Sequence, residues 1–423
     1  MNSVKIEVPY GRSNQCCTIP DNIDVIFGKL KQVHSEETAE VHVNAALKNL
    51  IGNIDLDKLI HSNSVAIAVS DITRPVPSRV ILESLISWLN EYGITEEKIT
   101  LIIGGGLHRP ANRQDLDYIL GDEILAKINK IEAHDADNFE MLQFLGESSN
   151  GTPVYVNKHF TQADFKIVTG MVDAHQFMGF TAGVKGAVIG LGGRPTITGN
   201  HALLFNEGAE LGRLEGNPAR ADLEDIGQII GVDMIVNVVL NDKKQVIKAV
   251  AGHPVVAHQQ AVEFAKQILG VEIKTADIVI TSPGGFPKDI NVYQAQKALT
   301  PASQIVKNGG TIILVAECLE GSGEESFVKE MSSYQSPKEI LDSYTSKPFI
   351  IGPHKAYLWA RALLKARVIL VSQIVDPEFA KLLMVEHRPT LQEAIDASIC
   401  DTSDLLTVTV LPYASSVIPI IKQ

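Results

Sequence analysis

Cysteine is scarce in this chain, and the few cysteines present are not spaced for disulfides or for a metal. The 423 residues include four of them, Cys16, Cys17, Cys318 and Cys400. They form neither a disulfide framework nor a Cys-x-x-Cys pair, and no His-Glu-x-x-His motif or His/Cys cluster accompanies them. The composition therefore predicts free thiols and a reducing compartment, which indicates the cytoplasm.

Long apolar runs and a leader pattern are also missing. Apolar runs such as 278–280 are short, and none approaches the roughly 18 uninterrupted residues of a membrane-spanning helix. The first residues, MNSVKIEVPYGR, lack the basic and then apolar order of a secretory signal. There is no internal repeat and no low-complexity tract. We therefore predict a cytoplasmic protein with no membrane partner.

Basic residues are outnumbered, with 37 Lys and Arg against 50 Asp and Glu and a net charge of −13. This balance argues against a nucleic-acid partner, because binding to phosphates needs a basic surface. In such an acidic chain, basic side chains in glycine-rich or turn-forming loops indicate a binding site for a small anion, because a cationic pocket attracts one. The residues of this kind are Arg74, His108, Arg109, His175, Lys185, Arg194 and His201.

The order of apolar patterns predicts an α/β protein with mostly parallel sheets. Short strand-like runs alternate with amphipathic helical runs, which is typical of parallel sheets covered by helices. We expect strands at 65–69, 101–103, 166–168, 234–240, 278–282, 311–316, 368–371 and 405–411. We expect helices at 80–92, 114–130, 259–269 with Gly270 as its C-terminal cap, 292–299 and 358–365.

The length predicts two domains, since a domain usually spans roughly 100–200 residues. We place the boundary near 269–275. Residues 1–270 would then form the cofactor-binding and catalytic domain, and residues 275–403 a C-terminal α/β domain. The last segment, 404–423, contains a strand able to pair in either domain. We expect the active site in the cleft between the two domains.

The segment 170–201 is unusually rich in glycine and reads GMVDAHQFMGFTAGVKGAVIGLGGRPTITGNH. Glycine loses more backbone entropy on folding than other residues, so this density predicts a backbone that must come close to a ligand. His175, Lys185 and His201 would then be directed at that ligand.

Two more loops have a similar character, 71–75 and 104–110, and each directly follows an expected strand. Open α/β sheets bind ligands beyond the carboxyl ends of their strands, so these loops and the glycine-rich segment predict one shared site. The glycines at 104–106 could cradle a phosphate through their backbone N–H groups, and a plain turn explains them equally well.

Each candidate residue also has a structural explanation. His108 and His175 could hydrogen-bond loop backbone, and an isolated lysine such as Lys185 is usually a solvated surface residue. Arg74 could form a surface ion pair, and Asp71 could cap a turn.

Motifs along nearly the whole chain, in the expected order, carry a family resemblance. In the first half they are Asp71-x-Thr-Arg-Pro, Gly106-Leu-His108-Arg-Pro, Asp173-Ala-His175-x-x-x-Gly-Phe-x-x-Gly-x-Lys185, Gly199-Asn-His201 and Glu215-Gly-Asn-Pro. In the second half they are Gly285-Phe-Pro-x-Asp289-x-Asn-x-Tyr293-Gln-x-x-Lys297 and Glu317-Cys-x-x-Gly321-x-Gly323. Together they resemble the nickel-dependent lactate racemase family.

The resemblance implies an isomerase, a racemase or C2-epimerase of 2-hydroxy acids. It also implies a nickel–pincer nucleotide, a pyridinium mononucleotide that holds nickel by one carbon and two sulfurs. Lys185 would bind this cofactor covalently through a thioamide, His201 would be the protein's nickel ligand, and His108 and His175 would be the acid–base pair. Asp71, Thr73, Gly105 and Gly106 would contact the nucleotide, and Arg74, Tyr293, Gln294 and Lys297 would line the substrate site.

The reaction chemistry agrees with these roles. Removing the α-proton of a 2-hydroxy acid is hard because the neighbouring carboxylate disfavours a carbanion, whereas removing a hydride gives a neutral ketone. No side chain accepts a hydride, so a cofactor must do so. Two histidines on different loops could then exchange the hydroxyl proton from opposite sides.

The chain departs from the family pattern in ways that leave the substrate open. The lysine loop reads Gly183-Val-Lys185-Gly, where many members have a basic residue before the lysine and a serine after it. Ile189-Gly-Leu stands where Pro-Gly is common, and the stretch 354–359, HKAYLW, lies near the expected aromatic position of the substrate site. We expect a small anionic substrate, either lactate or a larger 2-hydroxy acid or aldonate, and transient contact with cofactor-biosynthesis proteins.

Two other classes of function are kept as alternatives. One is a nucleotide- or sugar-acid-binding protein without turnover. The other is a zinc hydrolase that uses His175 and His201, although the sequence offers no third ligand at a usual spacing.

Overall fold

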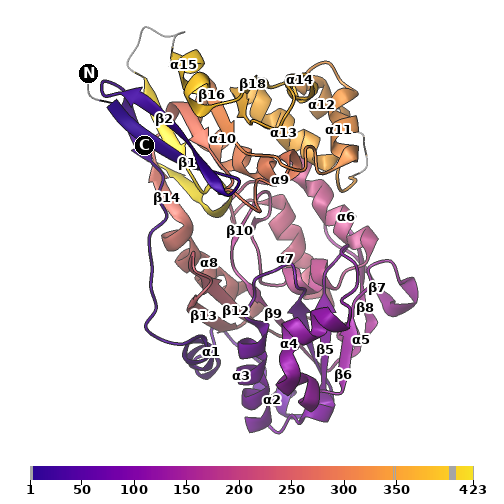
Figure 1. The fold of residues 1–423 in the computed structure, drawn as a ribbon. Coiled ribbons are helices and arrows are strands. Elements are labelled where there is room, and N and C mark those ends of the chain that lie inside the picture. The colour runs from indigo at the N-terminus through magenta and orange to yellow at the C-terminus, as the bar shows by residue number, and fades with distance from the viewer. Residues whose placement is uncertain (1–2, 346, 348, 400–405, 423) are drawn as a thin grey trace. The chain divides into compact units, whose positions relative to one another are not determined.

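The computed structural model describes residues 3–345, 347, 349–399 and 406–422. The chain divides into two compact units. Residues 32–268 form the first, called here the inserted unit because its sequence interrupts the other. Residues 1–31 and 269–423 form the second, the split unit. Figure 1 labels the helices and strands of both.

The inserted unit is built on a six-stranded sheet in the order β13-β12-β9-β4-β5-β6. Neighbouring strands are parallel except β12 and β13, which are antiparallel. The strands are β4 (Val65–Ser70), β5 (Ile99–Gly104), β6 (Lys130–Ala133), β9 (Phe165–Met171), β12 (Met234–Leu240) and β13 (Val246–Gly252). Two small hairpins accompany the sheet, β7 (Leu142–Glu147) with β8 (Pro153–Asn157) and β10 (Ala174–His175) with β11 (Gly179–Phe180).

Helices cover this sheet and bury its apolar strands. Val65–Val69 of β4 is buried throughout, as expected for a parallel strand packed on both faces. Leu82, Leu85 and Leu89 of α3 share its core cluster. The helices are α1 (Ala39–Lys48), α2 (Leu56–Ile60), α3 (Ser78–Glu91), α4 (Arg113–Lys127), α5 (Lys158–Gln162), α6 (Arg194–Ala202), α7 (Pro218–Ile230) and α8 (Pro254–Leu269), with short turns η1 (Glu96–Lys98), η2 (Phe139–Met141), η3 (Gly186–Gly190) and η4 (Leu203–Phe205).

The split unit has its own six-stranded sheet, in the order β18-β17-β16-β15-β19-β3, with every neighbouring pair parallel. Its strands are β3 (Asp24–Phe27), β15 (Ala276–Thr281), β16 (Val306–Val315), β17 (Arg367–Val371), β18 (Glu386–Arg388) and β19 (Thr407–Leu411). An antiparallel pair, β1 (Ser3–Tyr10) and β2 (Ser13–Pro20), and a parallel pair, β14 (Gly270–Ile273) and β20 (Ile418–Ile421), complete its strands among the described residues.

The helical segments of the split unit are mostly short. They are α9 (Val292–Ala295), η5 (Gln296–Ala298), α10 (Leu299–Ile305), α11 (Glu325–Ser332), α12 (Pro337–Ser343), α13 (His354–Lys365), α14 (Pro377–Leu382), α15 (Leu391–Ile399) and η6 (Ala414–Ser416).

The predicted α/β architecture with mostly parallel sheets is confirmed. The expected strands and helices are present with ends that shift by up to about five residues, although Leu405 at the start of the last strand lies outside the described residues. The exception is the helix predicted at 292–299, which is divided into α9, η5 and the first residue of α10. The helix predicted at 114–130 ends at Lys127, because β6 begins at Lys130. Gly270 directly follows the last residue of α8, and it is also the first residue of β14, where it pairs with Ile418.

The division of the chain differs from the predicted domains of 1–270 and 275–403. Residues 1–31 belong to the split unit, because β3 pairs with β19 and Ile6, Val8 and Ile19 share the core of that unit with β15. The described part of the last segment, 406–422, also belongs there, where β19 lies between β15 and β3.

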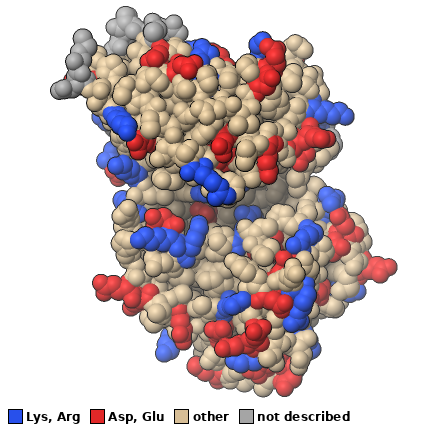
Figure 2. Space-filling view, viewed as in Figure 1, with Lys and Arg blue, Asp and Glu red and all other residues tan. Residues whose placement is uncertain are grey.

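Among the described residues, no helix combines the length and the apolar character that crossing a bilayer requires. Figure 2 shows acidic and basic side chains interspersed on the face in view. Cys16, Cys17 and Cys318 are free thiols, while Cys400 lies outside the described residues.

Candidate active site

The candidate site of the inserted unit lies at the carboxyl ends of three adjacent parallel strands. In the sheet β4 lies between β9 and β5, and Ser70 at the end of β4 is level with Gly104 at the end of β5. The loop 71–75 follows β4, and the loop 105–110 follows β5. The short helix η3, which follows Lys185, packs against all three strands. The three loops predicted to share a site are therefore neighbours in the fold.

Asp71 and His108 form a hydrogen-bonded pair that joins two of these loops. Asp71 Oδ2 lies 2.8 Å from His108 Nδ1, and Thr73 Oγ1 donates to Asp71 Oδ1 at 2.7 Å. Burial raises the pKa of the Asp71 carboxyl, but the hydrogen bonds from His108 and Thr73 and the nearby Arg74 outweigh it, so the pKa lies below its ordinary value. Asp71 is thus an anion that holds one ring nitrogen of an exposed histidine.

Glycine permits the backbone of this site to pack closely. A Cβ on Gly104 would lie 2.8 Å from the carbonyl oxygen of Gly190, and one on Gly106 would lie 2.9 Å from that of Ile189. Gly106 has a φ of +60° and donates its N–H to Gly190 O at 3.0 Å. Gly105 is half-buried, and a Cβ there would lie 3.2 Å from Asp71 Oδ2. The backbone of the loop after β5 therefore packs directly against the backbone at the end of η3.

Lys185 lies next to this contact, at the N-terminal end of η3. Among the described residues its amine has no hydrogen bond or ion pair. Burial lowers the pKa of this amine to about 7, with further lowering by Arg74 and Arg220 and an opposing effect of Asp71. An amine with such a pKa is largely uncharged just above neutral pH and is a competent nucleophile.

His175 and His201 both contact the ring of Phe177. The ring of Phe177 is edge-on to His175, with centroids 4.7 Å apart, and edge-on to His201 at 5.4 Å. His175 lies on β10, and its Nδ1 accepts the N–H of Met178 at 3.2 Å. His201 is half-buried in the last turn of α6. The described residues contain no group of three or more His, Cys, Asp and Glu side chains arranged to hold a metal.

A buried carboxylate fixes the helix that carries His201. Asp222 of α7 is fully buried and accepts from Ser148 Oγ at 2.5 Å, Thr152 Oγ1 at 3.1 Å and Asn200 Nδ2 at 2.9 Å. Asn200 precedes His201, and its amide also donates to Ala219 O at 3.0 Å. The network therefore joins α6 to α7.

Replacing Asp222 by alanine is expected to lower the free energy of unfolding of the inserted unit by about 3 kcal/mol, because several buried donors lose their acceptor. Urea denaturation followed by circular dichroism measures this change. The control is Asp137→Ala, which removes an exposed ion pair with Arg194 and should cost less than about 1 kcal/mol. Equal losses in the two variants would contradict the role given to Asp222.

Two of the basic residues predicted to line a cationic pocket have structural partners instead. Arg109 forms a two-pronged ion pair with Asp115, at 2.5 and 3.2 Å, which fixes the start of α4. Arg194 pairs in the same way with Asp137, at 2.7 and 2.6 Å. Asp115 follows Arg109 by 6 positions, whereas Asp137 lies 57 positions before Arg194, and the glycine-rich pattern indicates neither partner. Arg74 is exposed near Lys185.

The predicted substrate residues of the split unit, Tyr293, Gln294 and Lys297, lie together at the start of one helical segment. Lys297 Nζ donates to Gln294 Oε1 at 2.8 Å, and Tyr293 is half-buried. Lys355 of α13 was not predicted. It is buried, its Nζ donates to Tyr293 O at 2.5 Å and lies 3.7 Å from the centroid of the Tyr293 ring. Burial and the charge of Lys297 hold the pKa of Lys355 well below its ordinary value.

Other residues of the stretch 354–359 have structural contacts. Trp359 is fully buried, and its Nε1 donates to Leu383 O at 2.9 Å. His354 Nδ1 accepts the N–H of Gly352 at 3.2 Å, and burial lowers the pKa of its ring to about 4. Lys355 is thus the member of the stretch that touches a predicted substrate residue, and a lysine on an amphipathic helix gives no sign of this in the sequence.

Comparison with known proteins agrees with the motifs. The Lactate racemase N-terminal domain family matches residues 10–212, and the Lactate racemase C-terminal domain family matches residues 271–419. Lactate racemase of Thermoanaerobacterium thermosaccharolyticum is 30% identical over 98% of both chains. Lactate racemase of Lactiplantibacillus plantarum is 31% identical over 98% of this chain and 99% of its own.

Solved structures give the same result. The lactate racemase apoprotein from T. thermosaccharolyticum superposes with a TM-score of 0.89 at 30% identity, over 99% of this chain and 100% of its own. A protein of Thermotoga maritima, 16% identical, has a TM-score of 0.62 over 92% of this chain and 100% of its own, which shows a shared fold alone.

The fold and these matches define an α/β isomerase of the racemase type. The chain belongs to the lactate racemase family.

Proposed function

We propose that this chain is a racemase or C2-epimerase of a 2-hydroxy acid, with lactate as the first substrate to test. Both of the relatives compared above are lactate racemases. The observation that carries the proposal is the Asp71–His108 pair, which lies at the same sheet edge as the loop of Lys185. Larger 2-hydroxy acids and aldonates are the substrates to test after lactate, since the stretch 354–359 departs from the family pattern.

The two histidines have complementary hydrogen bonding. A carboxylate only accepts, so His108 carries a proton on Nδ1 toward Asp71, and its neutral ring leaves Nε2 as an acceptor. His175 accepts a backbone N–H on Nδ1, so its neutral ring carries the proton on Nε2. In the proposed reaction one ring takes the hydroxyl proton and the other returns it on the opposite face. The exposed guanidinium of Arg74 would bind the substrate carboxylate.

The residues present fit a nickel–pincer nucleotide. Lys185 offers an unpartnered amine with a pKa of about 7, and the contacts of Gly104 and Gly106 leave no side chain between the loops. A single histidine, His201, without a neighbouring ligand cluster in the described chain, suits a metal whose remaining donors come from the cofactor. When bound, this group would supply the hydride acceptor that side chains lack. We propose that Lys185 holds it covalently, that His201 ligates its nickel, and that Asp71, Thr73, Gly105 and Gly106 surround it.

We propose that the substrate site is completed by Tyr293, Gln294 and Lys297 of the split unit. Lys355 would hold Tyr293 in place through its hydrogen bond to Tyr293 O and its contact with the Tyr293 ring. We also propose a cytoplasmic location, since the cofactor would have to be delivered there by its biosynthetic proteins.

The test is to produce the chain together with the enzymes that build the nucleotide. Enantiomer interconversion is then followed by chiral chromatography for lactate, longer 2-hydroxy acids and aldonates. Intact mass and metal analysis establish whether the protein is loaded. We expect exchange of at least one acid by loaded protein. Loaded protein that exchanges none of them would contradict the proposed function.

A further inference from the structure

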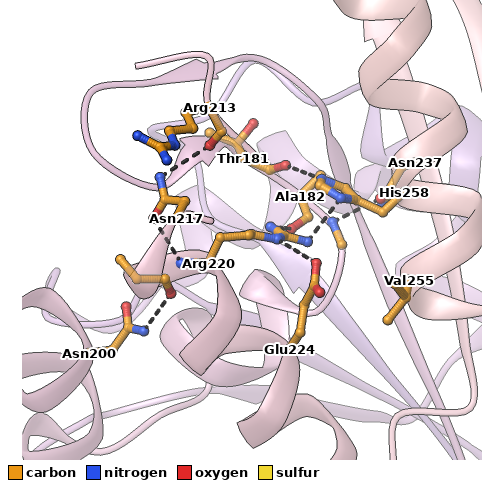
Figure 3. A network of polar contacts seen from close by, with 12 residues as sticks. Thr181, Ala182, Asn200, Arg213, Asn217, Arg220, Glu224, Asn237, Val255 and His258 are labelled. Carbon is orange, nitrogen blue, oxygen red and sulfur yellow. Dashed lines mark hydrogen bonds and ion pairs between the residues drawn. The ribbon is translucent and has the colours of Figure 1, made fainter. Parts of the chain in front are cut away.

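A buried arginine contacts the backbone just before Lys185. Arg220, in the first turn of α7, is 1% exposed. Its Nε lies 3.0 Å from Glu224 Oε1, its Nη1 donates to Ala182 O at 3.3 Å, and its Nη2 lies 2.9 Å from His258 Nδ1 (Figure 3). Removing a guanidinium from water costs free energy unless its N–H groups form hydrogen bonds. The buried position of Arg220 therefore depends on these contacts.

His258, from α8, extends this contact to the preceding residue. The ring is fully buried, and its Nε2 lies 2.8 Å from Thr181 O. A carbonyl only accepts, so Nε2 carries the proton and Nδ1 accepts from Arg220. Burial and the charge of Arg220 keep the pKa of this ring well below its ordinary value, so His258 is neutral. Figure 3 shows the ring between the guanidinium and the loop.

These contacts hold three consecutive backbone positions. His258 binds Thr181 O, Arg220 binds Ala182 O, and Asn237 Oδ1 accepts the N–H of Gly183 at 2.9 Å. Ala182 has a φ of +64° and Gly183 a φ of +61°, and alanine adopts such a left-handed conformation only when its surroundings impose it. The strained turn is therefore maintained by side chains from α7, α8 and β12.

The same turn leads directly into Lys185. Ala182 O, which accepts from Arg220, also accepts the backbone N–H of Lys185 at 3.3 Å. A Cβ on Gly183 would lie 2.5 Å from Arg220 Nη2, so the turn and the guanidinium leave no space between them. Any movement of the turn would consequently redirect the Lys185 side chain.

We infer that Arg220 and His258 are positioning residues, which hold the turn 181–183 in its left-handed form and thereby aim the amine of Lys185 into the site. Neither residue has a role in the proposed reaction. The inference rests on the proposed function in one respect, namely that Lys185 is the residue that holds the cofactor. Its test is read on full-length protein purified without cofactor, so its failure is distinguishable from a failure to racemise.

The test measures the pH dependence of Lys185 acylation by trace acetic anhydride, with peptide mass spectrometry and the exposed Lys243 as internal reference. The wild-type midpoint should lie at about 7. The charged groups that act on this amine are Arg74, Arg220 and Asp71. His258→Leu changes none of these charges, so a shift in that variant reports geometry.

We expect His258→Leu to raise the midpoint by about 1 unit or more, because a released turn exposes the amine to water. His258→Gln keeps a donor near Thr181 O and should bring the midpoint most of the way back to the wild-type value. Arg220→Lys retains the charge but cannot reach both Ala182 O and His258, so it should also shift the midpoint upward. The control is Lys166→Met, which removes another buried cation of the inserted unit and should leave the midpoint unchanged.

A wild-type midpoint in His258→Leu, with a loss of thermal stability like that of Lys166→Met, would show a purely structural role and overturn the inference. If His258→Leu does not fold, Asn237→Ala releases the Gly183 N–H of the same turn and is read in the same way. A shifted midpoint in Arg220→Lys, combined with a wild-type midpoint in both His258→Leu and Asn237→Ala, would likewise overturn it.

Discussion

Replacing Lys185 by arginine is expected to abolish racemisation, with a loss on the order of 10⁴-fold or more in kcat. Arginine keeps a positive charge at this position but is never a neutral amine, whereas the pKa of Lys185 is about 7. The variant should carry no covalent adduct in its intact mass and should not retain nickel after gel filtration. Chiral chromatography of lactate, or of whichever acid the wild type exchanges, measures the activity.

A matched control for this variant is Lys158→Arg, which alters a lysine on the surface of the same unit that donates to Glu140 O. It should retain the adduct and an activity within a factor of about 3, as expected of a surface change. Activity of Lys185→Arg within tenfold of wild type, or an adduct mapped to another lysine, would contradict the role assigned to Lys185.

His108→Gln is expected to lower kcat by about 10²–10⁴-fold, the range typical of a lost general base. The amide keeps a polar group of similar size, so the cofactor adduct and substrate binding should persist. Asp71→Asn should cost less, on the order of 10–100-fold, because the base remains but the hydrogen bond that fixes its Nδ1 proton is weakened. The double variant should be barely worse than His108→Gln alone, since the two residues act as a unit.

The control for His108 is Arg109→Met, one residue further along the chain. Arg109 pairs with Asp115 and not with the Asp71–His108 pair, so its loss should affect stability and leave kcat within a few-fold. His175→Gln should resemble His108→Gln in magnitude. Full activity in either histidine variant would remove that residue from the proposed reaction.

The central part of the site could be predicted because it follows local rules. Apolar strands at 65–69 and 101–103 end in polar loops, and adjacent parallel strands bring such loops to one edge. The same rule cannot say which charged groups face each other. Asp71 could be assigned to the nucleotide from the motif, but its contact with His108 depends on how two loops fold across 37 positions of sequence.

The errors concern side-chain contacts and strand pairings that local sequence patterns do not specify. Arg109 and Arg194 occur in loops with the composition of a ligand site, yet each has a carboxylate partner that sequence spacing does not reveal. The strand β3 finds its neighbour β19 almost at the other end of the chain, and no local pattern specifies that pairing. Lys355 meets Tyr293 only because α13 packs beside the segment that begins with α9.

The interrupted course of the split unit has a consequence for biosynthesis. Residues 1–31 are synthesised before residues 32–423, yet most of the core neighbours of Ile6, Val8 and Ile19 lie after residue 268. The inserted unit has all of its sheet and core within residues 32–268, so it can fold as soon as those residues have been synthesised. The N-terminal strands can reach their final packing only after residues 269–423 have been synthesised. During that interval the apolar faces of these strands lack the neighbours that bury them in the folded protein.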